Sequence, residues 1–395
     1  MRYILHNTLC GEKSNTYLFN EIMNDNIYFP QKKQKLNDAN LLSTLSYPSL
    51  MGFGTCNVYD PAVIENAFKI GYRHFDLAES YNNLAMVKTA LDIATSPFSK
   101  GGFGLSRSDI WLTMKVAKLN GDHHVDDLLI AVGTSYFDLL LYHKPFDHFG
   151  TEEETETSWR IICEQPTNKV KHVGVSNFYT PHLSRLLRIC TSKGLQIPFA
   201  NEILINPYTY GNDQDVIQLC KENNIFLIAY SPLGFYYSMI LLADKVILSA
   251  SNKFGITPAQ LVLTWLMSKN ISVIPKSDDE FRQAENYKSL AILDQIGFFI
   301  DEITESLDNL TNDDEFYMFD PALSSKAHGQ SLLQYVSVLP ISSNTADIVS
   351  AADVSAADVS VELVADVSAD DELRKNTNQD YCQKDDAVDS DQDHS

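Results

Sequence analysis

The sequence predicts a (β/α)8 (TIM) barrel, an α/β fold, with an N-terminal extension and a disordered acidic C-terminal tail. Between about residues 45 and 290, short apolar runs alternate with amphipathic stretches, and eight such runs can be counted. Near-continuous apolar runs separated by helices are typical of a parallel sheet that helices cover. No GxGxxG sequence occurs, which disfavours a doubly wound dinucleotide fold. We therefore expect a closed barrel in preference to an open sheet.

The predicted strands follow one another along the chain. The first ends at GFGT (52–55), and the other seven are RHFDLA (73–78), IWLTMKV (110–116), FDLLLYH (137–143), VKHVGVS (170–176), FANEILI (199–205), IFLIAYS (225–231) and ISVIPKS (271–277). Between them, helices are expected to begin at Asp60-Pro61, Thr180-Pro181 and Thr257-Pro258, where a capping side chain precedes a proline. Gly71 and Gly194 are placed to end two of these helices.

The chain divides into three predicted parts. Residues 1–40 form a polar extension of uncertain order, residues 41–325 the barrel, and residues 326–395 a low-complexity acidic tail. Within the tail, ADVSA-like units repeat every five residues, a period that suits neither a helix nor a strand. Residues 341–395 hold 14 acidic and three basic residues. We therefore expect this tail to be disordered.

Charge and cysteine content exclude several classes of protein. Against 30 Lys and Arg stand 52 Asp and Glu, a net charge of −22 that disfavours nucleic acid and anionic membranes as partners. The six cysteines include no close pair or CxxC, so we expect neither a disulfide framework nor a metal site. No run approaches the roughly 20 apolar residues of a membrane span. These features predict a cytoplasmic monomer that acts on a small molecule.

Polar side chains end six of the predicted strands: Asp76, Lys115, His143, Ser176-Asn177, Tyr230-Ser231 and Lys276-Ser277. In a barrel, the C-terminal strand ends and the loops that follow them form the active site. A single polar strand end can simply mark where the chain meets solvent. Six in succession favour a site.

The first three of these strand ends offer a defined chemistry. Lys115 ends an apolar strand, where a lysine is costly to bury unless it is paired, so we expect an ion pair with Asp76. Tyr81 follows Asp76 by five residues. An ammonium beside a phenol lowers the phenol's pKa from about 10, so Tyr81 can donate a proton to a developing alkoxide. With His143 orienting the same oxygen, the site can polarise a carbonyl, while another molecule supplies the electrons.

Residues 45–290 resemble the aldo-keto reductase family. The resemblance rests on GFGT (52–55), HFDLAESYNN (74–83), LTMK (112–115), LLLYHKP (139–145), KVKHVGVSNF (169–178), AYSPLG (229–234) and IPKSDDEFRQAEN (274–286), which occur in the family's order. It implies a catalytic tetrad of Asp76, Tyr81, Lys115 and His143. It also implies that hydride passes from NADPH to an aldehyde or ketone carbonyl, with Tyr81 as the general acid.

The resemblance further implies how NADPH is held. The nicotinamide would stack on Tyr230, and its carboxamide would bond to Ser176 and Asn177. The adenosine end would be held by a second group of residues. The 2′-phosphate would be bound by Lys276, Ser277 and Arg282, and the adenine would lie beside Glu285 and Asn286. Two cations and a hydroxyl suit a phosphate, although taken alone the cations could be ordinary surface residues. The remaining predicted cofactor contacts are Gly54, Thr55, Asp76, Glu202, Ser231 and Leu233.

The sequence also departs from the family pattern. Glu202 stands where the family has a glutamine that bonds the carboxamide, and a carboxylate can only accept hydrogen bonds. Further departures are Leu84, Lys88 and Thr264, an enlarged loop at 96–106 and an abbreviated loop at 232–244. Two other functions therefore stay open. One is a nucleotide-binding regulatory subunit without turnover; the other is an aldolase-type barrel in which Lys115 forms a Schiff base, a reading that Asp76 weakens by keeping Lys115 charged.

Overall fold

The computed structural model describes residues 48–119, 123–145, 151–296, 307–308 and 310. The predicted extension (1–40) and tail (326–395) lie outside these residues, as does most of the last part of the predicted barrel region, 297–325.

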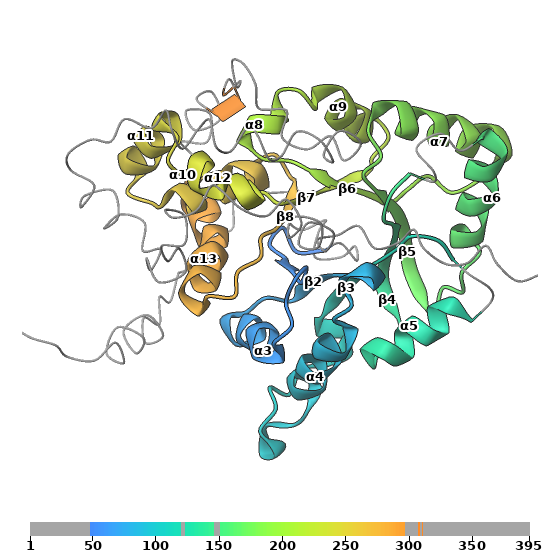
Figure 1. The fold of residues 1–395 in the computed structure, drawn as a ribbon, viewed down its shortest axis with the longest axis horizontal. Coiled ribbons are helices and arrows are strands. Elements are labelled where there is room, and N and C mark those ends of the chain that lie inside the picture. The colour runs from blue at the N-terminus through green and yellow to red at the C-terminus, as the bar shows by residue number, and fades with distance from the viewer. Residues whose placement is uncertain (1–47, 120–122, 146–150, 297–306, 309, 311–395) are drawn as a thin grey trace, which may run out of the picture. The chain divides into compact units, whose positions relative to one another are not determined.

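The strands form one parallel eight-stranded sheet, in which spatial order follows chain order (Figure 1). They are β1 (Phe53–Gly54), β2 (His74–Ala78), β3 (Trp111–Val116), β4 (Phe137–Tyr142), β5 (Val170–Ser176), β6 (Ala200–Leu204), β7 (Phe226–Tyr230) and β8 (Ser272–Ile274). The first and last strands are joined as well: Gly52 N donates to Val273 O at 2.8 Å, and Val273 N donates to Leu50 O at 2.8 Å. These bonds close the sheet, which confirms the predicted (β/α)8 barrel.

Helices surround the strands (Figure 1). Those of eight or more residues are α3 (Pro61–Ile70), α4 (Leu84–Thr95), α5 (His124–Val132), α6 (Glu152–Cys163), α7 (Thr180–Lys193), α9 (Gln214–Glu222), α11 (Lys245–Phe254), α12 (Pro258–Ser268) and α13 (Glu280–Ile296). The shorter ones are α8 (Pro207–Tyr210), α10 (Ser238–Leu242) and the 3-10 helices η1 (Glu79–Tyr81), η2 (Phe98–Lys100), η3 (Arg107–Asp109) and η4 (Phe235–Tyr237).

Two of the three predicted helix caps are present. Asp60 accepts a hydrogen bond from Ala62 N, and Thr257 accepts one from Gln260 N, each satisfying a free amide of the first turn. The prediction for Thr180 is wrong, because α7 begins at Thr180 itself and Tyr179 occupies the cap position. Gly194 ends α7 with φ 65°, a left-handed conformation that glycine adopts without strain.

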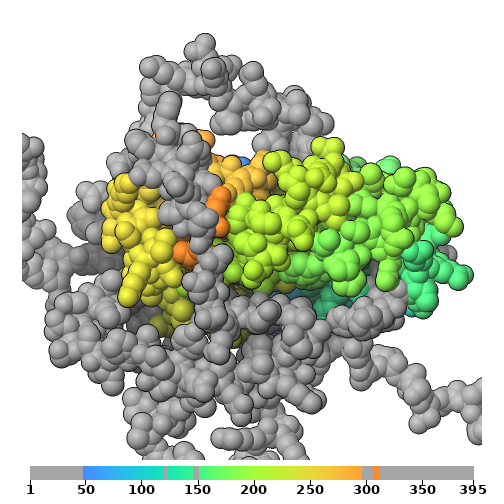
Figure 2. All heavy atoms as spheres, turned by 90° about the horizontal axis from the view of Figure 1, so that it is seen from above, coloured from blue at the N-terminus to red at the C-terminus, as the bar shows by residue number. Residues whose placement is uncertain are grey.

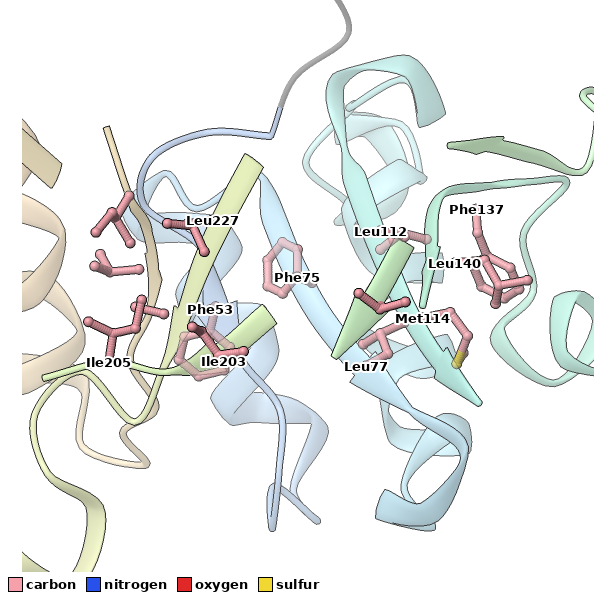
Figure 3. Packing of buried hydrophobic residues seen from close by; sticks show 14 of the residues in the cluster. Phe53, Phe75, Leu77, Leu112, Met114, Phe137, Leu140, Ile203, Ile205 and Leu227 are labelled. Carbon is pink, nitrogen blue, oxygen red and sulfur yellow. The ribbon is translucent and has the colours of Figure 1, made fainter. Parts of the chain in front are cut away.

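Side chains that point alternately outward and inward along each strand separate the hydrophobic core, under the helices, from the barrel interior. On β2, Phe75 and Leu77 join the buried hydrophobic cluster shown in Figure 3, and on β3 so do Leu112 and Met114. Successive side chains of a strand point to opposite faces. Asp76, between Phe75 and Leu77, is therefore directed into the barrel.

The segment after β7, predicted to be an abbreviated loop, folds into η4 and α10. In Figure 2 the yellow spheres of α10 and α11 lie at the surface of the described residues. Several apolar side chains of this segment are exposed, among them Tyr236 at 58% and Met239 at 67%.

Candidate active site

Three buried charged residues meet inside the barrel. Lys115 Nζ, from β3, lies 2.5 Å from Asp76 Oδ2 on β2 and 2.7 Å from Glu202 Oε1 on β6. All three residues are at most 2% exposed. This arrangement, hereafter the charge cluster, contains the predicted Asp76–Lys115 ion pair. The contact between Glu202 and Lys115 was not predicted.

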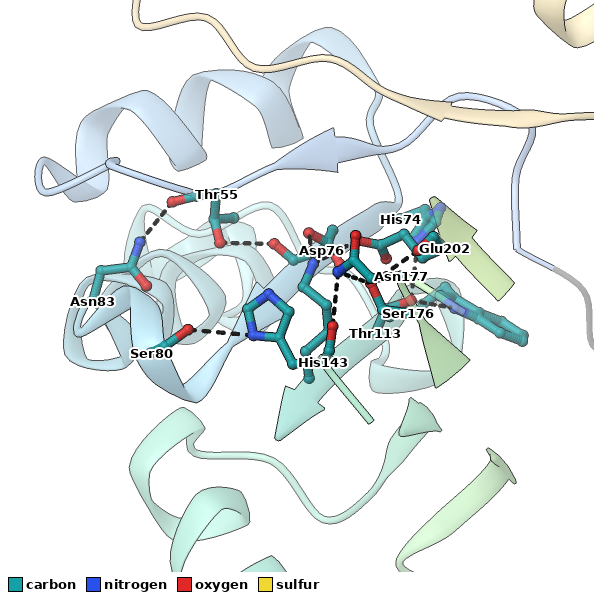
Figure 4. A network of polar contacts seen from close by, with 12 residues as sticks. Thr55, His74, Asp76, Ser80, Asn83, Thr113, His143, Ser176, Asn177 and Glu202 are labelled. Atoms are coloured by element: carbon teal, nitrogen blue, oxygen red, sulfur yellow. Dashed lines mark hydrogen bonds and ion pairs between the residues drawn. The ribbon is translucent and has the colours of Figure 1, made fainter. Parts of the chain in front are cut away.

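Tyr81 and His143 lie beside the charge cluster, and both are half-buried. Tyr81 closes η1, which follows β2 directly, and the centre of its ring is 5.1 Å from Lys115 Nζ. The rings of Tyr81 and His143 are 6.0 Å apart between centroids and nearly perpendicular. Ser80 Oγ is 3.3 Å from His143 Nδ1 (Figure 4). The structure therefore brings the predicted tetrad together and adds Ser80, which the sequence analysis missed.

The acidity of Tyr81 differs from the prediction. Burial raises the pKa of its phenol well above the ordinary value, and this outweighs the lowering by Lys115. The carboxylates of Asp76 and Glu202 also raise that pKa, because they disfavour a second negative charge nearby. The sequence argument counted the ammonium but neither the lost solvation nor the second carboxylate. Tyr81 is consequently protonated at neutral pH.

The charge states of Lys115 and His143 follow from the same surroundings. Burial lowers the pKa of Lys115, but Asp76 and Glu202 together leave it well above its ordinary value. Burial, aided by Lys115, lowers the pKa of His143 to about 3. Lys115 is thus an ammonium and His143 a neutral imidazole. A charged lysine cannot attack a carbonyl, which argues against the Schiff-base chemistry of an aldolase.

Ser176, Asn177 and Tyr230, all predicted to hold the nicotinamide, contact one another at the ends of β5 and β7. Tyr230 Oη donates to Asn177 Oδ1 at 2.8 Å, and Asn177 Nδ2 donates to the carbonyl of His143 at 2.8 Å. Ser176 Oγ donates to the carbonyl of Glu202 at 2.9 Å. These bonds connect the predicted cofactor residues to the backbone of two site residues, and Figure 4 shows the bonds of Ser176 and Asn177.

Gly54, at the end of β1, and Thr55, which follows it, connect the first strand to the site. Thr55 Oγ1 donates to the carbonyl of Asp76 at 2.7 Å, and Asn83 Nδ2 donates to the carbonyl of Thr55 at 2.7 Å (Figure 4). A Cβ atom at Gly54 would lie 2.9 Å from Ile274 O, so only glycine lets β1 pass this close to β8. Asn83 is a further residue that the sequence analysis did not identify.

The residues predicted to bind the 2′-phosphate lie where the chain passes from β8 into α13. Lys276 and Ser277 precede α13, and Arg282 lies in its first turn. Lys276 Nζ is 2.6 Å from Asp278 Oδ2, a carboxylate that the prediction did not consider. Ser277 Oγ accepts from Asp279 N at 3.1 Å, and Asp279 Oδ1 accepts from Arg282 N at 2.8 Å. These bonds build the turn into α13. Lys276, Ser277 and Arg282 lie within seven consecutive residues of the chain.

The other predicted cofactor residues have separate surroundings. The carbonyl of Glu285 accepts from Gln260 Nε2 at 3.2 Å, and Asn286 is 4% exposed. Ser231 has a left-handed backbone with φ 48°. Leu233 is half-buried and packs against the hydrophobic core.

Comparison with known proteins identifies the family of this barrel. The model of the Aldo/keto reductase family matches residues 57–296, more than half of the chain. The chain belongs to the aldo/keto reductase family.

Relatives within the family are distant in sequence. A D/L-glyceraldehyde reductase of Hypocrea jecorina is 31% identical over an alignment of 280 positions, which covers 62% of this chain and 81% of the relative. An aldehyde reductase of Saccharomyces cerevisiae is 29% identical over an alignment of 279 positions, which covers 62% of this chain and 84% of the relative. The aldose reductase structure of Giardia lamblia superposes with a TM-score of 0.58 at 28% identity, over 71% of this chain and 97% of that one.

Two further observations describe this family member. Across the described ranges, no three or more His, Cys, Asp or Glu side chains are arranged to hold a metal ion. In the same residues, no helix has the length and apolar character needed to cross a bilayer.

Proposed function

We propose that this aldo/keto reductase transfers hydride from NADPH to the carbonyl of a small aldehyde or ketone, with Tyr81 as the proton donor. The observation that carries the proposal is the meeting of Tyr81, His143 and Lys115 at the C-terminal ends of neighbouring strands. The similarity to a glyceraldehyde reductase and an aldehyde reductase supports the substrate class.

In this proposal Tyr81 and His143 act on the carbonyl oxygen. Tyr81 is protonated, so it holds the proton that the oxygen needs as it gains negative charge. His143 is neutral, and Ser80 contacts its Nδ1, which leaves Nε2 to bond the same oxygen. Lys115 stabilises the phenolate that Tyr81 becomes, since an ammonium favours a negative charge nearby.

The electrons come from outside the side chains, and NADPH supplies them as hydride when it is bound. Ser176, Asn177 and Tyr230 would hold the nicotinamide, with Gly54, Thr55, Ser231 and Leu233 around it. Lys276, Ser277 and Arg282 would hold the 2′-phosphate, and Glu285 and Asn286 the adenine. The donor set fits such a ligand, because two cations and a hydroxyl within seven consecutive residues match the charge of a phosphate.

The regulatory alternative would use the same nucleotide without turnover. The raised pKa of Tyr81 favours it to a degree, since a weaker acid gives up its proton more slowly. The intact tetrad favours catalysis.

Measuring NADPH oxidation with a panel of aldehydes, ketones and sugars distinguishes the two. We expect turnover of at least one class. Tight NADPH binding with no turnover on the whole panel would instead support the regulatory role.

A further inference from the structure

The charge cluster holds two carboxylates but one cation. Asp76 Oδ2 and Glu202 Oε1 both contact Lys115 Nζ, at 2.5 and 2.7 Å. The second oxygens, Asp76 Oδ1 and Glu202 Oε2, are buried and accept no hydrogen bond from any described residue. If all three groups are ionised, the barrel interior carries a net negative charge with too few donors to stabilise it. Such an arrangement is costly, and two neighbouring carboxylates relieve it by keeping one proton.

The groups that face Glu202 indicate where this proton resides. They come from four elements: Asp76 on β2, Tyr81 on η1, Lys115 on β3 and Tyr230 on β7. Lys115 is the single cation among them. Burial, together with the charge of Asp76, raises the pKa of Glu202 to about 8, although Lys115 opposes the rise. Glu202 is therefore the carboxyl that we expect to hold the proton.

We propose that Glu202 is a positioning residue that holds an exchangeable proton beside Lys115 and thereby sets how strongly Lys115 acidifies Tyr81. The inference rests on the proposed reductase function. It adds to the site the ionisation of Glu202, which the tetrad of Asp76, Tyr81, Lys115 and His143 does not include.

The consequence for Tyr81 follows from charge alone. With Glu202 neutral, only Asp76 offsets the ammonium of Lys115, so Lys115 stabilises the phenolate that forms when Tyr81 gives up its proton. With Glu202 ionised, a second negative charge acts on Tyr81, and the phenol becomes a weaker acid. Carbonyl reduction should accordingly slow as the pH rises through the ionisation of Glu202. The proton on Glu202 is not consumed in the reaction.

Glu202→Gln tests this directly, because glutamine keeps the size of the side chain and an oxygen for Lys115 but cannot ionise. We expect wild-type kcat for carbonyl reduction at saturating NADPH to fall about tenfold between about pH 6.5 and about pH 9. In Glu202→Gln the fall in kcat over the same pH range should be about twofold or less. Glu222→Gln, an exposed carboxylate at the end of α9, is the matched control and should keep the wild-type profile.

Two measurements report on the proton without turnover. Infrared difference spectra of the wild type should show a protonated carboxylic acid that titrates with a midpoint near pH 8, and Glu202→Gln should lack that band. The second measurement is the midpoint temperature of thermal unfolding. Because the pKa of Glu202 is higher in the folded state than in the unfolded one, its stabilising contribution is complete below about pH 4.5 and is lost as the pH rises through about 8. Glu202→Gln should therefore raise the midpoint, relative to wild type, more at pH 9 than at pH 5.

The outcomes separate the inference from the proposed function. If wild type and Glu202→Gln both reduce carbonyls with the same pH profile, the role of Glu202 is overturned and the reductase stands. If the infrared band titrates but no carbonyl is reduced, Glu202 holds the proton and the proposed function fails. If Glu202→Gln does not fold, spectra of Asp213→Asn decide, because this variant removes the other carboxyl, among the described residues, whose pKa burial raises, to about 7. The absence of any remaining acid band that titrates near pH 8 would overturn the inference.

Discussion

The ammonium of Lys276 lies 2.6 Å from the carboxylate of Asp278, two residues further along the chain. In the proposed cofactor site, this pair places a negative charge beside a cation that would hold the 2′-phosphate. If NADPH binds as proposed, Asp278 would compete with the phosphate for Lys276 and weaken the preference for NADPH over NADH.

Replacing Asp278 with asparagine should strengthen NADPH binding about two- to fivefold and leave NADH binding unchanged. The effect is small because both partners are partly exposed and solvent screens their interaction. Fluorescence titration with the two nucleotides measures it. Glu280→Gln removes a neighbouring acid without touching this pair, so it controls for net charge. An equal change for NADPH and NADH in Asp278→Asn would contradict the role of Asp278.

Arg282→Ala should act in the opposite direction. A charge-assisted hydrogen bond to the phosphate would be lost, so NADPH binding should weaken by about 1.5–3 kcal/mol more than NADH binding. Calorimetric titration with both nucleotides measures the difference. Equal losses would mean that Arg282 does not contact the 2′-phosphate.

Tyr81→Phe should lower kcat for carbonyl reduction about 10²–10⁴-fold, because the ring and its packing stay while the acidic hydroxyl is removed. The dissociation constant of NADPH should not change, since its proposed contacts lie on other residues. Initial rates and nucleotide titrations test the two statements. Tyr72→Phe is the control. Tyr72 precedes β2 and lies apart from the tetrad, and its buried hydroxyl donates to the carbonyl of Gln283. A comparable rate in Tyr81→Phe would assign the proton to another group.

The buried histidine of β2 should make the barrel acid-sensitive. His74 is fully buried, its Nε2 lies 3.1 Å from Thr113 Oγ1, and burial lowers its pKa to about 3. Because this pKa is depressed in the folded state, the unfolded chain binds the extra proton first. The stabilising contribution is complete above about pH 6.5 and is lost at about 1.4 kcal/mol per pH unit as the pH falls toward 3.

Glutamine in His74→Gln offers Thr113 an amide group in place of the ring nitrogen but cannot titrate. The slope of the unfolding free energy against pH below about 6.5, measured by urea unfolding, should therefore be smaller by about one proton. His123, which is exposed, supplies the control variant His123→Gln, whose slope should match that of the wild type. An unchanged slope in His74→Gln would mean that His74 does not govern the acid sensitivity.

Much of the barrel can be predicted from the sequence, since buried parallel strands appear as unbroken apolar runs. The run at 110–116 corresponds to β3 (Trp111–Val116) within one residue. The pairing of Asp76 with Lys115 was also predictable, because their strands are neighbours and both residues lie near the C-terminal ends. The position of Thr180 relative to its helix was not predictable. A threonine before a proline can occupy the cap position or the first position of the helix, and the sequence is the same in both cases.

Tertiary structure alone decided the electrostatics of the site. Glu202 is 87 residues from Lys115 in the chain and three strands away in the sheet, and it meets Lys115 only because the sheet curves into a closed barrel. The acidity of Tyr81 likewise depends on how much water the folded chain removes and on which charges surround the phenol. A linear sequence specifies which side chains alternate inward. The distances and the dielectric surroundings that set their proton affinities arise only when distant strands pack together.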